Sequence, residues 1–148
     1  MQVTPFNAYL SAPDAAASAK ISEIRVASGL PAEFKAWNDG YSSLKGEKQQ
    51  AFLDQAGALV PRADVAAYVN HIDYIAKRIG WEHVGIGTDF DHGAGITGFD
   101  SEADAPNVTA ELVTRGYTQE QIAAIWGGNF LRVLKAAEGL AKTTTAQN

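Results

Sequence analysis

The pattern of hydrophobic and polar residues changes at about residue 80, from a helical repeat to a short apolar run. Residues 63–79 carry apolar side chains about one helical turn apart, and Gly80 follows them as a typical helix end. Residues 83–88, with the sequence HVGIGT, include four consecutive positions without a polar side chain. Such a short apolar run predicts a buried strand. Only two residues separate it from the helix, which is typical of a tight αβ connection.

The first sixty residues contain weaker signals for further elements. Residues 1–10 predict a strand in which Pro5 disfavours a central, fully paired position. Pro13 and Asp14 are typical of a helix start, and this helix is expected to end near Gly29 or Pro31. Residues 30–60 predict an irregular connection that contains a short helix at 47–55.

The C-terminal sixty residues predict three helices separated by turns. Asn107 is expected to cap a helix that ends at Gly116, and Thr118 with Gln121 has the spacing of a capping box for the next one. The sequence WGGN at 126–129 predicts a break before an amphipathic helix capped by its asparagine. Residues 139–148 are expected to form a frayed tail.

The order of strand, helices, strand and helices predicts an α/β fold. Two strands can neither close a barrel nor make an independent parallel sheet with both faces covered. An apolar strand such as 83–88 expects a neighbouring strand on each side, and the chain predicts only one partner. The sequence therefore indicates a part of a larger α/β domain.

Composition excludes several classes of function. The chain has 12 Lys and Arg against 17 Asp and Glu, and its basic residues are scattered, so a nucleic-acid surface is not expected. It contains no cysteine, which excludes disulfides and thiolate metal sites and leaves the cellular compartment open. No segment has the length and hydrophobicity of a membrane span, and the N-terminal sequence lacks the pattern of a signal peptide.

Ionisable side chains follow the predicted strand 83–88 directly. Asp89, Asp91 and His92 come within four positions, ahead of Gly93 and Gly95. The carboxyl ends of parallel strands are common positions for catalytic groups, and paired carboxylates can hold a metal, orient an ammonium group or move protons. The alternatives are that an acid caps the loop or pairs with an arginine, and that His92 only supports the loop.

Two stretches of the sequence resemble a known enzyme family. They are HIDYIAKRIGWEHVGIGTDFDHGAG at 71–95 and APNVTAELVTRGYTQEQIAAIWGGNFLRVL at 105–134. Both are similar to the C-terminal portion of zinc-dependent dipeptidases of the membrane (renal) dipeptidase family, with the best match over 63–138. The resemblance implies a (β/α)8 TIM-like barrel, of which residues 3–8 and 83–88 would be about the last two strands, and which is incomplete as given.

The resemblance also implies an activity and residues that serve it. The family hydrolyses dipeptides at a two-zinc site, and Asp89 matches the acid that faces the substrate amino group and takes part in proton transfer. Phe6 and Asn7 fall near a strand end that contacts substrate in the family. Asp91 matches a second acid expected to support the loop, and His92 stands where many members have glycine. The family's zinc ligands lie upstream, so no metal ligand is expected in this segment.

These implications lead to a main hypothesis and two alternatives. The main one is that a full-length zinc dipeptidase uses this segment for its last-strand acid, that the upstream half of the barrel is its partner, and that the isolated chain is inactive. One alternative is a self-contained Asp-x-Asp-His metal site formed by residues 89–92, either within one chain or completed across an oligomer. The other is a noncatalytic remnant that assembles with an N-terminal half. Homo-oligomers are compatible with each hypothesis.

Overall fold

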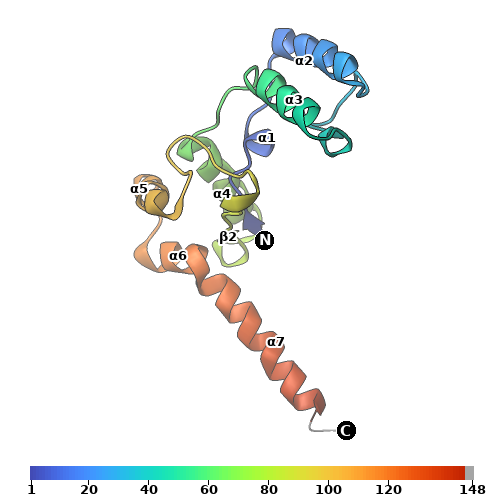
Figure 1. The fold of residues 1–148 in the computed structure, drawn as a ribbon. Coiled ribbons are helices and arrows are strands. Elements are labelled where there is room, and N and C mark those ends of the chain that lie inside the picture. Colours follow the sequence, from blue (N-terminus) through green and yellow to red (C-terminus); the bar gives the residue numbers. More distant parts are fainter. Residues whose placement is uncertain (146–148) are drawn as a thin grey trace. The chain divides into compact units, whose positions relative to one another are not determined.

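The computed structural model describes residues 1–145 (Figure 1). The chain folds into two compact units. The strand unit comprises Met1–Pro5 and the chain from Asp64 onward, and the helical unit comprises Phe6–Ala63. The structure is a helix-rich α/β arrangement with one small parallel sheet. Among the described residues, no helix has the length and apolar character that a bilayer span requires.

The sheet of the strand unit consists of two short parallel strands. β1 (Gln2–Val3) pairs with β2 (Gly85–Ile86), and the amide of Gly87 extends the ladder by donating to the carbonyl of Val3 over 2.8 Å. The prediction of a strand over 1–10 is wrong beyond Val3, because Pro5 has no amide hydrogen with which to continue a ladder. The predicted strand 83–88 is likewise shortened to its central residues.

The chain after β1 forms helix α1 (Asn7–Leu10), which belongs to the helical unit. Its backbone closes a bond from the amide of Ser11 to the carbonyl of Asn7 over 2.9 Å. Residues 7–10 of the predicted strand are therefore helical.

Helix α4 (Val65–Ile79) confirms the clearest pattern in the sequence. Asp64 caps its start by accepting a hydrogen bond from the amide of Ala67, and Gly80 ends it with a φ of 98°. Three of its side chains, Tyr68, Val69 and Ile72, are fully buried. The buried face of α4 lies against β1.

Helix α5 (Ala105–Thr114) begins three residues earlier than predicted. Asn107 lies inside the helix and donates to the carbonyl of Gly98, so its predicted capping role is wrong. A capping box between Ser101 and Asp104 in the preceding short turn supplies the start signal instead.

Residues 119–145 form one continuous helical run. Helix α6 (Gln119–Ala123) begins at the predicted Thr118–Gln121 capping box, which the structure confirms. A π-helical turn, Ala124–Gly128, then leads into α7 (Asn129–Thr145), the long helix at the C-terminal end in Figure 1.

The predicted break at 126–129 is wrong, because the π-helical turn accommodates both glycines within the helix. Asn129 has helical dihedral angles and does not cap a helix. Its side chain donates to the carbonyls of Trp81 and Val84 and so ties the helical run to the start of β2. Helix α7 also extends through much of the predicted tail, and residues 146–148 lie outside the described chain.

The helical unit has a small core of its own. Helix α2 (Ala15–Ser28) starts at the predicted place, with Asp14 as its cap, and ends at Gly29, and it packs against α3 (Glu47–Gly57). Buried apolar side chains between them form this core: Ile21, Leu30, Leu44, Phe52, Ala56 and Val60.

Arg25 organises the irregular connection after α2. It is 2 % exposed and donates hydrogen bonds to the backbone carbonyls of Pro31, Trp37 and Asp39. Its guanidinium also lies over the ring of Phe34. Residues 30–46 lack long regular elements, as predicted, but a buried cation fixes their path.

A polar cluster joins α4 to the end of α5 in the strand unit. The carboxylate of Asp73 accepts hydrogen bonds from the Tyr117 hydroxyl over 2.6 Å and from Arg115 over 3.0 Å, and Lys77 lies 3.2 Å away. Arg115 also pairs with Glu111 over 2.8 Å. Burial raises the pKa of Asp73, but hydrogen bonds from Tyr117, Arg115 and Lys77 outweigh it and hold the pKa below its ordinary value.

This cluster predicts an acid-dependent loss of stability. Because the folded state lowers the pKa of Asp73, its contribution is complete above about pH 4 and is lost as the pH falls through the lower value of the folded state. Asp73→Asn is expected to lower the free energy of unfolding by about 1–3 kcal/mol at pH 7 and by less at low pH. Urea denaturation across pH measures this, with the exposed Glu120→Gln as control. A difference that did not shrink at acid pH would contradict the prediction.

Candidate active site at the carboxyl end of the second strand

Asp89 occupies an unusual backbone conformation just beyond β2. Its φ and ψ are 55° and 31°, and it is the only residue other than glycine with a positive φ in the described chain. Aspartate tolerates this left-handed region better than most residues because its short side chain can hydrogen-bond locally. Such conformations occur often at functional sites, and the Asp89 side chain is 46 % exposed. The structure therefore presents a carboxylate to solvent at the predicted position.

A tight turn brings His92 back to Asp89. The amide of His92 donates to the carbonyl of Asp89 over 3.2 Å, and the imidazole Nδ1 lies 3.4 Å from Asp89 Oδ1. Asp91, in the same short 3-10 turn, is exposed. The structure thus places Asp89 and His92 in contact, whereas Asp91 lies beside them without joining that pair.

An aromatic cluster around the buried ring of Phe99 holds this turn in place. The ring of Phe90 packs edge-on against Phe99, with ring centres 5.0 Å apart, and Phe99 is fully buried. Phe99 also contacts Tyr68 and Trp126, at 5.5 and 6.3 Å between ring centres. Aromatic packing of this kind restricts the position of the chain between Asp89 and His92.

Tyr68 connects the site to both strands, a role that the sequence analysis missed. Its hydroxyl donates to the carbonyl of Val3 over 2.8 Å and lies 3.4 Å from the carbonyl of Gly87, two residues before Asp89. Burial raises the pKa of Tyr68, so the hydroxyl remains protonated and available as a donor at neutral pH. The sequence did contain a signal for its burial, since the spacing of Tyr68 from Val65 and Ile72 places it on the apolar face of α4.

Phe6 and Asn7 belong to the helical unit, at the start of α1. The ring of Phe6 lies against Tyr9, with centres 5.5 Å apart. The Asn7 amide nitrogen donates to the carbonyl of Pro61, and its oxygen accepts from the amide of Ala63 over 2.6 Å. Asn7 therefore ties the beginning of the helical unit to its end. A role for either residue in substrate binding stays a prediction.

The described residues do not fit a zinc site by themselves. Within residues 1–145, no three or more His, Asp or Glu side chains are grouped so that they could hold a metal ion. Asp89 and His92 are in contact, but Asp91 does not complete a ligand set with them. Side-chain geometry gives the hypothesis of a self-contained metal site at 89–92 no support.

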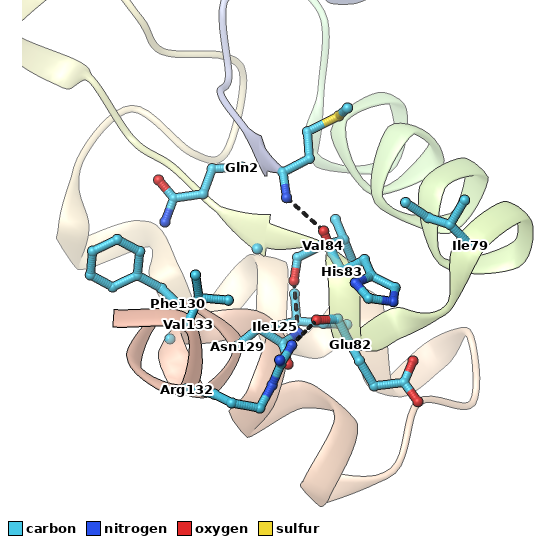
Figure 2. Close-up of a pocket in the computed structure, with 13 residues that line it drawn as sticks. Gln2, Ile79, Glu82, His83, Val84, Ile125, Asn129, Phe130, Arg132 and Val133 are labelled. Carbon is cyan, nitrogen blue, oxygen red and sulfur yellow. Dashed lines mark hydrogen bonds between the residues drawn. The ribbon is translucent and has the colours of Figure 1, made fainter. Parts of the chain in front are cut away.

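An apolar groove lies at the opposite, amino-terminal ends of the strands (Figure 2). It has a volume of about 550 Å³ and is lined by residues from β1, β2, the end of α4 and α7. Ile79, Phe130 and Val133 line it and are each more than half exposed. The Met1 amino group donates to the carbonyl of His83 at one side of the groove, over 2.6 Å. The strand unit thus exposes apolar surface next to its short sheet.

Comparison with known proteins identifies the family. The sequence model of the membrane dipeptidases, peptidase family M19, matches residues 1–148. The chain belongs to the membrane dipeptidase family. Its structure is also similar to the crystal structure of the probable dipeptidase PvdM from Pseudomonas aeruginosa, with a TM-score of 0.70 and 34 % identity over 88 % of this chain.

Individual dipeptidases match about half of the chain. Dipeptidase ataJ of Aspergillus terreus is 45 % identical over 80 residues, and dipeptidase aclJ of Aspergillus oryzae is 37 % identical over 82 residues. These matches cover 53 % and 55 % of this chain. The chain spans about a fifth of the length of each relative, 20 % and 19 %, and 35 % of the PvdM chain.

Proposed function

We propose that residues 1–148 are the C-terminal segment of a (β/α)8 barrel in a zinc-dependent dipeptidase, and that the longer protein hydrolyses dipeptides. The observation that carries this proposal is the Asp89 carboxylate, held in a left-handed turn at the carboxyl end of β2 within a chain that the family matches throughout. In barrel enzymes this end of the strands is where catalytic groups lie.

In this proposal the residues of the turn have separate roles. The half-exposed carboxylate of Asp89 pairs with the ammonium group of the dipeptide and moves a proton during hydrolysis. Asp91 and His92 support the turn, and Phe6 and Asn7 contribute to substrate binding. The zinc ligands are assigned to the part of the enzyme outside residues 1–148, because the family resemblance implies that they lie upstream.

The rest of the barrel is the proposed occupant of the apolar groove. A parallel sheet is normally covered on both faces and has strands on both sides, whereas within residues 1–145 β1 and β2 pair only with each other. The groove at their amino-terminal ends exposes Ile79, Phe130 and Val133, which other parts of the same enzyme would cover. The N-terminal half of the barrel is therefore the partner that we propose for this surface.

Hydrolysis of free and N-acetylated dipeptides tests the proposed function. The complete polypeptide that carries this chain is expected to cleave a free dipeptide, to lose that activity with a chelator, and to spare the acetylated form because it lacks the ammonium group. The 148-residue chain, dialysed against metal-free buffer, is expected to hold almost no zinc and to cleave neither. A zinc-loaded complete protein without dipeptide cleavage would contradict the proposal and favour a noncatalytic partner. One or two zinc ions held tightly by the short chain would contradict the assignment of the ligands.

A further inference from the structure

The buried hydroxyl of Tyr68 meets the sheet at its last rung before Asp89. The Val3 carbonyl accepts hydrogen bonds from the Gly87 amide and from the Tyr68 hydroxyl, each over 2.8 Å. The Gly87 carbonyl lies 3.4 Å from the same hydroxyl. A hydroxyl has a single proton, so the shorter contact is the stronger hydrogen bond and the longer one is a close polar contact. Tyr68 therefore holds together the two strand segments just before the Asp89 turn.

The ring of Tyr68 reaches the same turn by a second route. It packs against Phe99, with ring centres 5.5 Å apart, and Phe99 packs edge-on against Phe90, with ring centres 5.0 Å apart. Phe90 directly follows Asp89 in the sequence. The hydroxyl and the ring of Tyr68 thus restrain the chain immediately before and immediately after Asp89.

The contacts of Tyr68 are complete within this chain. Tyr68 is fully buried among the described residues, so the rest of the longer protein is not needed to form its surroundings. Beyond Asp89, the Gly95 amide donates to the Pro5 carbonyl over 2.9 Å, which returns the loop to the segment that follows β1. Because the loop is anchored on both sides of Asp89, loss of the Tyr68 hydroxyl is expected to shift the turn slightly and not to release it.

We propose that Tyr68 is a positioning residue for dipeptide hydrolysis, whose hydroxyl fixes the rung between β1 and β2 and thereby the place of the Asp89 carboxylate. The inference rests on the proposed function, because it takes Asp89 as the group that binds the substrate ammonium and moves a proton. In this scheme Tyr68 acts on the substrate only through Asp89.

A small displacement of Asp89 is expected to affect proton transfer more than substrate binding. Proton transfer requires the carboxylate within hydrogen-bond reach, whereas the attraction between a carboxylate and an ammonium group falls only gradually with distance. Tyr68→Phe keeps the ring and removes only the hydroxyl. Since a misplacement of about 1 Å can cost about 10²-fold in rate, this variant is expected to lower kcat by about tenfold and to change KM by less than about twofold.

Tyr117→Phe is the matched control for this substitution. The Tyr117 hydroxyl donates to Asp73 in the polar cluster between α4 and the end of α5, so the same chemical change is made in the same unit. Each variant loses one hydroxyl hydrogen bond and is expected to melt at a lower temperature than wild type. Only Tyr68→Phe is expected to lower kcat.

A double-mutant cycle tests whether the effect of Tyr68 passes through Asp89. Tyr68→Phe is expected to have little effect on the residual kcat of the Asp89→Asn protein. Replacement of Tyr68 by 4-aminophenylalanine, whose aromatic amine also donates a hydrogen bond, is expected to restore much of the kcat. Should the phenylalanine variant not fold, 4-fluorophenylalanine, which fills the space of the hydroxyl but cannot donate, takes its place in each comparison. All assays use the complete, metal-loaded protein at temperatures where thermal melting shows each form to be folded.

The possible outcomes separate this inference from the proposed function. An unchanged kcat for folded Tyr68→Phe would overturn the role of Tyr68, while dipeptide cleavage by wild type would leave the proposed function standing. An equal fall of kcat in Tyr117→Phe, or the same fall in the Asp89→Asn background, would also overturn it, because the hydroxyl would then act through the fold in general. A folded, zinc-loaded wild type that cleaves no dipeptide would overturn both.

Discussion

Asp89→Asn is expected to lower kcat/KM for dipeptide hydrolysis by about 10²–10⁴-fold, the usual contribution of a group that transfers a proton in the transition state. Asparagine has the same shape and also tolerates the left-handed region that Asp89 occupies with a φ of 55°. The substitution therefore removes the charge and the proton-transfer site while it preserves the turn. Steady-state kinetics of the complete protein, with zinc content measured for each preparation, gives the result.

Asp91→Asn is the matched control for this substitution. Asp91 lies two residues away in the same turn, is also exposed, and has the same chemistry. Because we assign it to loop support, its loss is expected to be much smaller than that of Asp89. Equal losses from the two variants, or a folded Asp89→Asn protein with almost full activity, would contradict the assignment of Asp89.

Phe99→Ala is expected to lower the free energy of unfolding by about 3–5 kcal/mol, the usual cost of removing a large aromatic ring from a core. Phe99 is fully buried and packs against Tyr68, Phe90 and Trp126. Its removal leaves a cavity between α4 and the helical run that follows α5. Urea denaturation of the purified protein measures the change.

Phe99→Leu controls for the loss of volume, since leucine fills most of the space without the aromatic contacts. Its effect on stability is expected to be clearly smaller than that of alanine. At temperatures where the complete protein with Phe99→Ala is still folded, its dipeptide hydrolysis is also expected to fall, because Phe90 loses the ring that anchors the Asp89 turn. A loss of stability below about 1 kcal/mol for the alanine variant would contradict this account of the core.

Local sequence signals predicted those elements whose boundaries depend on neighbouring residues. The helix start at Pro13 and Asp14, the Thr118–Gln121 capping box and the helix that ends at Gly80 are all present, because each depends on hydrogen bonds within one turn. The length of the first strand, in contrast, depends on where Pro5 interrupts pairing with β2. Asn107 and Asn129 were misassigned as caps because their amides bond to carbonyls that are distant in sequence or lie outside the helix.

The candidate site was predictable in position but not in form. The strand pattern placed Asp89 at the carboxyl end of β2, where the structure also has it. Its left-handed conformation and its contact with His92 depend on Phe90, Phe99 and Tyr68, which meet only in the folded chain. The family resemblance is confirmed, and the family match covers residues 1–148.

The hydrogen bonds of the Asn7 side chain have a consequence for how this chain can change in evolution or by engineering. They join the first residues of the segment Phe6–Ala63 to its last residues, so the two ends of this segment lie close together. Segments with adjacent ends can be exchanged, shortened or enlarged with little disturbance to their host. Residues 6–63 are therefore the segment in which new sequence is best introduced while β1, α4 and the Asp89 turn are kept.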